Sequence, residues 1–153
     1  MLKKFLFIIV TLLIIAWMFA WPYPICGDCM EPAVKDGSYA FVNRIAPYLR
    51  EYKIGDIVVF RHEKKSWIAR IVGLENDTIQ ITDGTILVNG ASVCDSVQRN
   101  WSNWKYGTYG IDEPLRVPSG YVYVVSDDLS AHHDDSRVFG PIPNKSIEGL
   151  VWQ

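Results

Sequence analysis

The sequence predicts a compact, mainly β domain of antiparallel strands that follows one N-terminal transmembrane helix. An unbroken apolar run extends from Phe5 to Trp21, with Thr11 as its only clearly polar member. Beyond it, apolar and polar residues alternate in short segments separated by turns rich in Gly, Asp, Asn and Pro, the pattern typical of half-buried strands. At 153 residues, the chain has room for one domain with a core of its own.

The apolar run favours an uncleaved anchor over a cleaved secretory signal peptide. As a helix it would be about 25 Å long, slightly less than the roughly 30 Å hydrocarbon core of a bilayer. Cleavage would need small residues at −3 and −1; Ala20 would suit −1, but Met18 is bulky at −3. Trp17 and Trp21 instead suit the aromatic belt at a membrane interface.

Two lysines before the run indicate its orientation. Lys3 and Lys4 should stay in the cytoplasm by the positive-inside rule. Residues 1–21 are therefore expected to form a single-pass anchor in the plasma (inner) membrane, in contact with lipid and with a short cytoplasmic end. Residues 22–153 are expected to form an extracytoplasmic domain.

The predicted domain is built from short strands. Six segments share the pattern: Ser38–Ile45, Asp56–His62, Ser66–Gly73, Thr78–Thr82, Ile86–Val88 and Tyr121–Ser126. Turn signals such as Asp83-Gly84 and Asn89-Gly90 separate them. No stretch beyond the anchor has a convincing helical stripe. The irregular segment from Cys94 to Val117 is interpreted as an insertion over the sheet or a small cap near a site.

Composition and charge exclude some classes of function. Hydrophobic residues make up 49% and charged residues 21% of the chain, which argues against disorder. The net charge is −2, and no basic stripe suggests a nucleic-acid partner. Cys26, Cys29 and Cys94 are an odd number of cysteines, which leaves at least one thiol unpaired or paired between chains.

Several motifs resemble type I signal peptidases of the S26 family, in the family's order along the chain. Gly27-Asp28-Cys29-Met30-Glu31-Pro32 resembles the nucleophile box, Ser-Met-x-Pro, that follows the membrane anchor. The other matching segments are Asp36–Arg44, Gly55–Phe60, Ile68–Leu74, Leu87–Gly90, Val117–Tyr121, Ser126–Asp128 and Asp135–Pro141. The resemblance covers almost the whole predicted domain.

The resemblance implies a membrane-bound endopeptidase, a protease that removes signal peptides during protein secretion. Its substrates would be signal peptides or one specialised exported pre-protein. The family uses a serine nucleophile and a neutral lysine as general base. This sequence differs at both positions, with Cys29 for the serine and Ala69 for the lysine.

The two differences are chemically compatible. Serine depends on a base, whose help is worth about 10²–10⁴ in rate. A thiol with the reference pKa of about 8.5 is already a few per cent thiolate at neutral pH. His133 matches the position of a family serine beside the lysine, so it is the candidate replacement base, with Asp134 or Asp128 to orient its ring. The alternative is that His132 and His133 are surface residues of a polar loop.

The remaining site residues follow from the same resemblance. The backbone N–H of Cys29 should stabilise the oxyanion, and Gly27 should let the backbone bend close to substrate. Met30 and Pro32 are expected to shape the site wall. The positions expected to be structural near the site are Arg70, Asp127, Asp135 and Arg137.

Other functions were weighed against the peptidase. Cys26 and Cys29 form a C-x-x-C, but no βαβ pattern or zinc spacing accompanies it. No cofactor or metal is therefore expected, although a reversible Cys26–Cys29 disulfide is an open alternative. The main rival is a catalytically inactive relative that assists secretion or the assembly of pili and other surface structures.

Overall fold

A computed structural model describes residues 2–19, 21–93, 105–128 and 133–152. The helices are α1 (Leu2–Phe19), α2 (Ala46–Leu49), α3 (Ser136–Phe139) and the 3₁₀ turn η1 (Asn144–Ser146). The strands are β1 (Trp21–Pro24), β2 (Tyr39–Asn43), β3 (Ile57–His62), β4 (Lys65–Gly73), β5 (Thr78–Thr82), β6 (Thr85–Val88), β7 (Ala91–Ser92), β8 (Leu115–Arg116), β9 (Tyr121–Val125), β10 (Ile142–Pro143) and β11 (Ile147–Val151).

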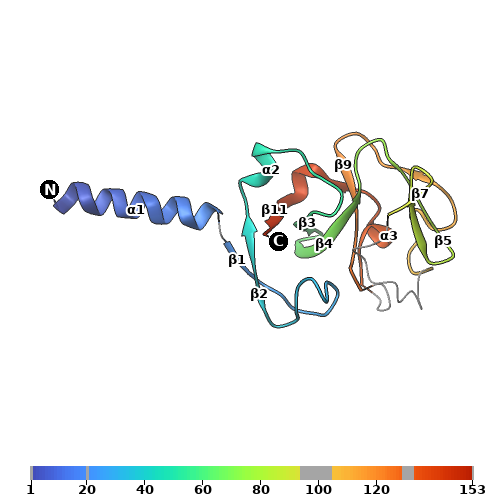
Figure 1. Ribbon diagram of the computed structural model, residues 1–153, viewed down its shortest axis with the longest axis horizontal. Coiled ribbons are helices and arrows are strands. Elements are labelled where there is room, and N and C mark those ends of the chain that lie inside the picture. Colours follow the sequence, from blue (N-terminus) through green and yellow to red (C-terminus); the bar gives the residue numbers. More distant parts are fainter. Residues whose placement is uncertain (1, 20, 94–104, 129–132, 153) are drawn as a thin grey trace.

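The strands form two sheets (Figure 1). The larger has the order β1-β2-β11-β3-β4-β9-β10, and the smaller has the order β7-β6-β5-β8. Every pairing between named strands is antiparallel. The prediction of a mainly antiparallel β domain is confirmed.

All six predicted strands are present, with ends shifted by at most two residues. In β5 the alternation matches burial, because Ile79 and Ile81 are buried while Thr78, Gln80 and Thr82 are less so. The predicted Asp83-Gly84 turn joins β5 to β6, and both residues have positive φ angles (48° and 70°). Such angles give the tight hairpin turn that suits twisted strands.

The sequence pattern missed β1 and β11, which lie at the edge and in the interior of the larger sheet. β1 contains two prolines, a composition that argues against a strand except at a sheet edge. β11 contains Gly149, where the register with β3 shifts. A Cβ at Gly149 would lie 2.5 Å from Val42 Cγ1 and 2.8 Å from the Asn43 carbonyl oxygen, so glycine permits the close approach of β11 to β2.

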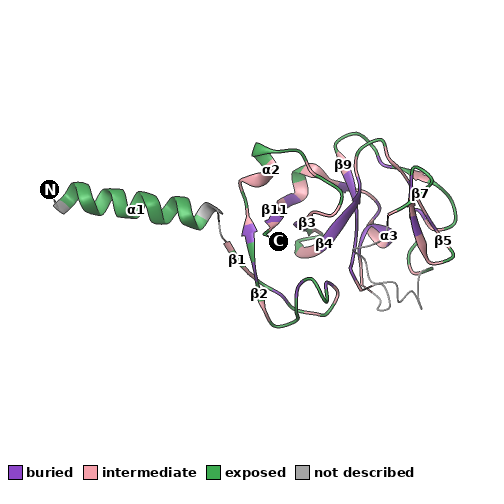
Figure 2. Cartoon of the chain, in the orientation of Figure 1, coloured by how far each residue is buried: buried purple, intermediate pink, exposed green. Residues whose placement is uncertain are grey.

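Helix α1 extends away from the β domain and its described side chains are exposed (Figures 1 and 2). Within the residues that the structure describes, no helix is both long and apolar enough to cross a bilayer, so the expected spanning anchor over residues 1–21 is not found. Trp21, the last residue of the predicted anchor, pairs with Val42 as the first residue of β1. The Trp21 ring contacts Trp17 of α1 edge to face, with 4.5 Å between centroids.

The structure describes only part of the segment Cys94–Val117, which is interpreted from its sequence as an insertion over the sheet or a small cap. Cys94 and the residues up to 104 lie outside the described ranges. The segment 105–112 lies against α3: the backbone N–H groups of Thr108 and Tyr109 both donate to the Arg137 carbonyl. Gly107 approaches that carbonyl so closely that no side chain would fit.

Replacing Gly149 by Ala should destabilise the domain by roughly 1–3 kcal/mol, because the new methyl would overlap Val42 and backbone of β2. Urea unfolding measures the change. Ser92→Ala, on the exposed strand β7, is the control and should change stability by less than about 0.5 kcal/mol. A Gly149→Ala variant as stable as this control would contradict the close packing of β11 on β2.

Candidate active site

The predicted nucleophile, Cys29, lies in a turn between β1 and β2. Two backbone hydrogen bonds close the base of this turn, from Ile25 N to Ser38 O and from Gly37 N to Ile25 O. Gly27 has a φ of 109°, and its N–H donates to Asp36 Oδ1 at 2.7 Å. The glycine therefore provides a backbone bend that other residues rarely adopt.

Apolar packing fixes the turn to the sheet. Met30 is fully buried and packs with Ile25, Val34, Ala40 and Ile57, and the partly buried Cys29 borders this cluster. Met30 thus supports the turn from beneath. Neither Met30 nor the exposed Pro32 is among the residues that line the cavity beside Cys29, and a part for them in shaping the site wall stays a prediction.

A cavity of about 430 Å³ opens beside Cys29. Three segments enclose it: β1 with the nucleophile turn, the middle of β4, and the stretch after β9. The lining residues are Tyr23, Pro24, Ile25, Cys26, Gly27, Cys29, Ser66, Trp67, Ile68, Ser126, His133 and Asp134. Such a volume accommodates several atoms of a ligand while keeping them close to the sulfur.

Cys29 and His133 line this same cavity, so the fold brings the predicted pair together. His133 Nε2 lies 3.3 Å from Asp28 Oδ1, an ion-pair distance if the ring is protonated. Nε2 is shielded from solvent and has no hydrogen bond of good geometry. His132 lies outside the described residues.

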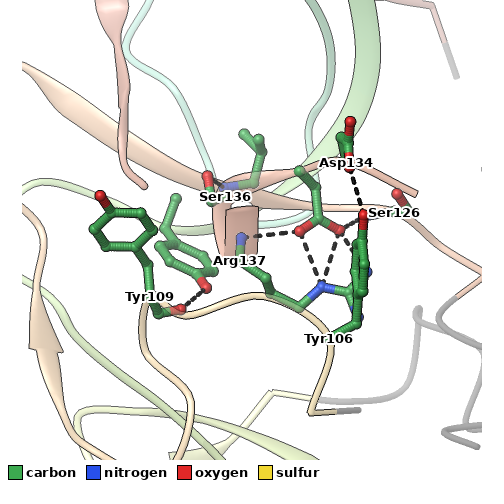
Figure 3. Close-up of polar contacts among 9 residues, drawn as sticks. Tyr106, Tyr109, Ser126, Asp134, Ser136 and Arg137 are labelled. Atoms are coloured by element: carbon green, nitrogen blue, oxygen red, sulfur yellow. Dashed lines mark hydrogen bonds and ion pairs between the residues drawn. The ribbon is translucent and has the colours of Figure 1, made fainter. Parts of the chain in front are cut away.

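Asp134 is held by a different partner. The hydroxyl of Tyr106 donates to Asp134 Oδ1 at 2.7 Å, and Figure 3 shows this contact beside Arg137. The Arg137 guanidinium lies 5.9 Å from the centroid of the Tyr106 ring. Asp28 lies at ion-pair distance from His133, and orientation of the ring by Asp134 or Asp128 stays a prediction.

The charge state of the thiol differs from the expectation. The pKa of Cys29 is raised to about 11, first by burial and then by the nearby Asp28 carboxylate, while its own backbone N–H opposes the rise. Only about one thiol in ten thousand would be ionised at neutral pH, rather than a few per cent. Attack by this sulfur therefore requires a base that accepts its proton.

Ala69 lies in β4, opposite Val58 of β3. It is buried in the apolar core with Phe60 and Ile71, and it is not among the residues that line the cavity. Its neighbours Trp67 and Ile68 do line it. The position that resembles the family's lysine therefore contributes no polar group to the cavity.

The four residues predicted to be structural near the site form two buried ion pairs. Arg70 donates to both Asp127 oxygens at 2.7 and 2.6 Å, and its third contact is the Gly55 carbonyl. Burial raises the pKa of Asp127, and Arg70 opposes that rise. Arg137 and Asp135 are both fully buried and paired at 2.8 Å.

Asp135 also connects the ion pair to the chain around the cavity. Its carboxylate accepts the backbone N–H of Ser126 at 3.0 Å and that of Arg137 at 2.9 Å. Ser136 Oγ accepts the N–H of Val124 in the adjacent strand β9. These bonds fix the residues on both sides of the stretch that carries His133.

The cysteine motif shows no metal arrangement. Cys26 is exposed, and both Cys26 and Cys29 are free thiols. In the described ranges, no three His, Cys, Asp or Glu side chains are grouped to hold a metal ion.

Several known proteins are similar to this chain in both sequence and fold. The family model described as "Signal peptidase, peptidase S26" matches residues 1–152. The chain belongs to the S26 signal peptidase family. Signal peptidase I of Bacillus licheniformis is 31% identical over 151 residues, which cover 93% of this chain and 79% of the relative.

Two further relatives agree with this assignment. Signal peptidase I of Bacillus amyloliquefaciens is 30% identical over 146 residues, covering 93% of this chain and 78% of the relative. The crystal structure of a signal peptidase I from Enterococcus faecalis is 28% identical, with a TM-score of 0.55. It covers 67% of this chain and 98% of the solved chain. The similarity thus extends to the fold.

Sequence reasoning missed several cavity residues of this signal peptidase family member. Ser66, Trp67 and Tyr23 line the cavity although no motif marks them. Asp28 was quoted within the nucleophile box but was given no role. The alternation along β4 would have placed Ser66 and Ile68 on the same face, but it does not say what that face covers.

Removing the Arg137 side chain should be severely destabilising. Arg137→Leu leaves Asp135 buried without its cation, and breaking such a pair costs about 3–5 kcal/mol. Arg50→Gln breaks the partly exposed Arg50–Asp56 pair and should cost no more than about 1 kcal/mol. Urea unfolding of both variants checks the difference, and equal losses would contradict a supporting role for the buried pair.

The pH dependence of thiol alkylation tests the environment of Cys29. In the folded protein, iodoacetamide labelling of Cys29 should have its midpoint near pH 11, because only the thiolate reacts. In urea the midpoint should fall to about 8.5, the value of a solvated thiol. Mass spectrometry of the Cys29 peptide follows the reaction. A folded-state midpoint at or below the urea value would contradict the raised pKa.

Proposed function

We propose that this chain is a membrane-associated endopeptidase that cleaves signal peptides or a specialised exported pre-protein, with Cys29 as nucleophile and His133 as base. The observation that carries the proposal is the shared cavity, which Cys29 and His133 line from separate segments. Membership of a family of peptidases supports the reaction class.

The proposed reaction begins with a proton transfer. The Cys29 thiol gives its proton to the His133 imidazole as the sulfur attacks the scissile carbonyl carbon, and the backbone N–H of Cys29 stabilises the oxyanion. Collapse of the tetrahedral intermediate breaks the C–N bond, and His133 gives its proton to the leaving amine. His133 then takes a proton from a water molecule as that water attacks the thioester carbonyl carbon. The thioester is hydrolysed at its C–S bond, and His133 returns the proton to the Cys29 sulfur.

The raised pKa of Cys29 makes the base essential in this mechanism. A free thiolate is rare at neutral pH because burial disfavours the charge. Proton transfer within the cavity avoids that population limit, because the thiolate forms together with an imidazolium that offsets its charge. The Cys–His pair thus provides what the family's lysine provides for serine.

The proposed location is extracytoplasmic, with α1 attaching the domain to the plasma membrane. The exposed apolar side chains of α1 support attachment to lipid, since such a surface is costly in water. Lys3 and Lys4 at the start of the helix favour a cytoplasmic N-terminus. Exported pre-proteins would reach the cavity from the same membrane.

A second function is favoured by a specific observation, the absence of a polar group at Ala69 combined with the raised pKa of the Cys29 thiol. These features suit a non-catalytic relative that binds exported chains and assists secretion or the assembly of surface structures. In that case the cavity would bind a signal peptide without cutting it.

Cleavage by the full chain in detergent separates the two functions. With a pre-protein substrate, Cys29→Ala should abolish cleavage and His133→Ala should lower its rate by about 10²–10⁴, the usual value of a general base. His62→Ala is the matched control, because His62 stacks on Phe139 outside the cavity. It should cleave at the wild-type rate.

A different pair of results would favour the non-catalytic function. No cleavage by the wild-type chain, together with signal-peptide binding that Cys29→Ala leaves unchanged in fluorescence anisotropy, would favour the non-catalytic function. Cleavage that survives Cys29→Ala would exclude Cys29 as nucleophile.

A further inference from the structure

The contact between Asp28 and His133 joins two separate segments beside the cavity that His133 lines. Asp28 immediately precedes Cys29 in the nucleophile turn, and His133 follows β9 by eight residues in sequence. Asp28 Oδ1 lies 3.3 Å from His133 Nε2. The residue beside the nucleophile therefore extends its carboxylate to the candidate base.

The Asp28 carboxylate and the His133 ring can each serve as the other's hydrogen-bond partner. Across the described ranges, no lysine or arginine pairs with Asp28, whose side chain is 63% exposed. His133 Nε2 is shielded from solvent and has no hydrogen bond of good geometry. A shielded ring N–H is costly without an acceptor. Asp28 Oδ1, 3.3 Å from Nε2, can serve as that acceptor.

The other carboxylates nearby have different partners. Asp134 accepts the Tyr106 hydroxyl, Asp135 accepts the Arg137 guanidinium, and Asp127 accepts the Arg70 guanidinium. Figure 3 shows Asp134 turned toward Tyr106. Asp28, by contrast, is at ion-pair distance from the ring.

We propose that Asp28 is the positioning residue of the site: it holds His133 in the tautomer with the proton on Nε2, so that Nδ1 accepts the proton of Cys29. The inference rests on the proposed Cys–His chemistry and adds the residue that prepares it. A carboxylate hydrogen-bonded to one ring nitrogen fixes the tautomer, and it stabilises the imidazolium that forms in the reaction.

Asp28 has a second, opposing effect that makes the proposal testable. Its negative charge is also one cause of the raised pKa of the Cys29 thiol. Replacing the carboxylate by a neutral amide should lower that pKa and so increase the thiolate fraction at a given pH. A purely electrostatic role would therefore make Asp28→Asn more reactive, whereas a positioning role makes it a slower peptidase.

The experiment compares Asp28→Asn, Asp28→Glu and the control Glu31→Gln in the full chain. Asp28→Asn should lower kcat for pre-protein cleavage by about 10–100-fold with little change in KM, while the alkylation midpoint of Cys29 moves to lower pH. Asp28→Glu should restore part of the lost kcat. Glu31→Gln, in the same turn but outside the cavity, should match the wild type.

A second measurement does not depend on cleavage. The ¹⁵N shifts of the His133 ring at about pH 8, where an imidazole is mostly neutral, should show the Nε2–H tautomer in the wild type and a mixture in Asp28→Asn. An unchanged tautomer, or an unchanged kcat while Cys29→Ala remains inactive, would overturn the role of Asp28 and leave the peptidase proposal intact. If the wild-type chain does not cleave the pre-protein, the peptidase proposal fails. The ¹⁵N shifts of the His133 ring would still decide whether Asp28 fixes its tautomer.

Discussion

The buried pair between Asp135 and Arg137 is the interaction on which the site depends. Both side chains are fully buried, and the carboxylate also accepts backbone N–H groups from Ser126 and Arg137. The carboxylate bonds fix the chain on both sides of His133, whereas Nη1 of the buried Arg137 has no hydrogen-bond partner within the described residues. The position of the candidate base relative to Cys29 is thus set by an ion pair that lies outside the cavity.

Cysteine and the missing lysine form one consistent chemical pattern, although the reason differs from the one the sequence suggested. The reference pKa of a thiol implies partial ionisation without help, but the partial burial that anchors the turn through Met30 raises the pKa of Cys29. The same packing that positions the sulfur therefore suppresses its charge. A neutral pair of thiol and imidazole, charged only during the reaction, satisfies both constraints.

Much of the fold could be predicted because it depends on local patterns. Alternation located β5, a β-branched and aromatic run located β9, and the Asp83-Gly84 pair marked the turn that the structure closes with two positive φ angles. β11 could not be predicted, because Gly149 lacks strand propensity. The glycine is needed only for the close contact of β11 with β2, which is far away in sequence. Motifs picked out Cys29 and His133 as candidates, whereas the role proposed for Asp28 depends on a contact that forms only when folding brings two distant segments together.

The junction between α1 and the sheet has a consequence for where a bound chain would be cut. Only residue 20 separates the end of α1 from β1, and four register pairs lock β1 to β2. Four residues of strand rise about 13 Å, so β1 holds the start of the nucleophile turn at about that distance from the end of α1. In the proposed peptidase, with α1 attached to the membrane, this spacing would determine which bond of a bound pre-protein reaches the Cys29 sulfur.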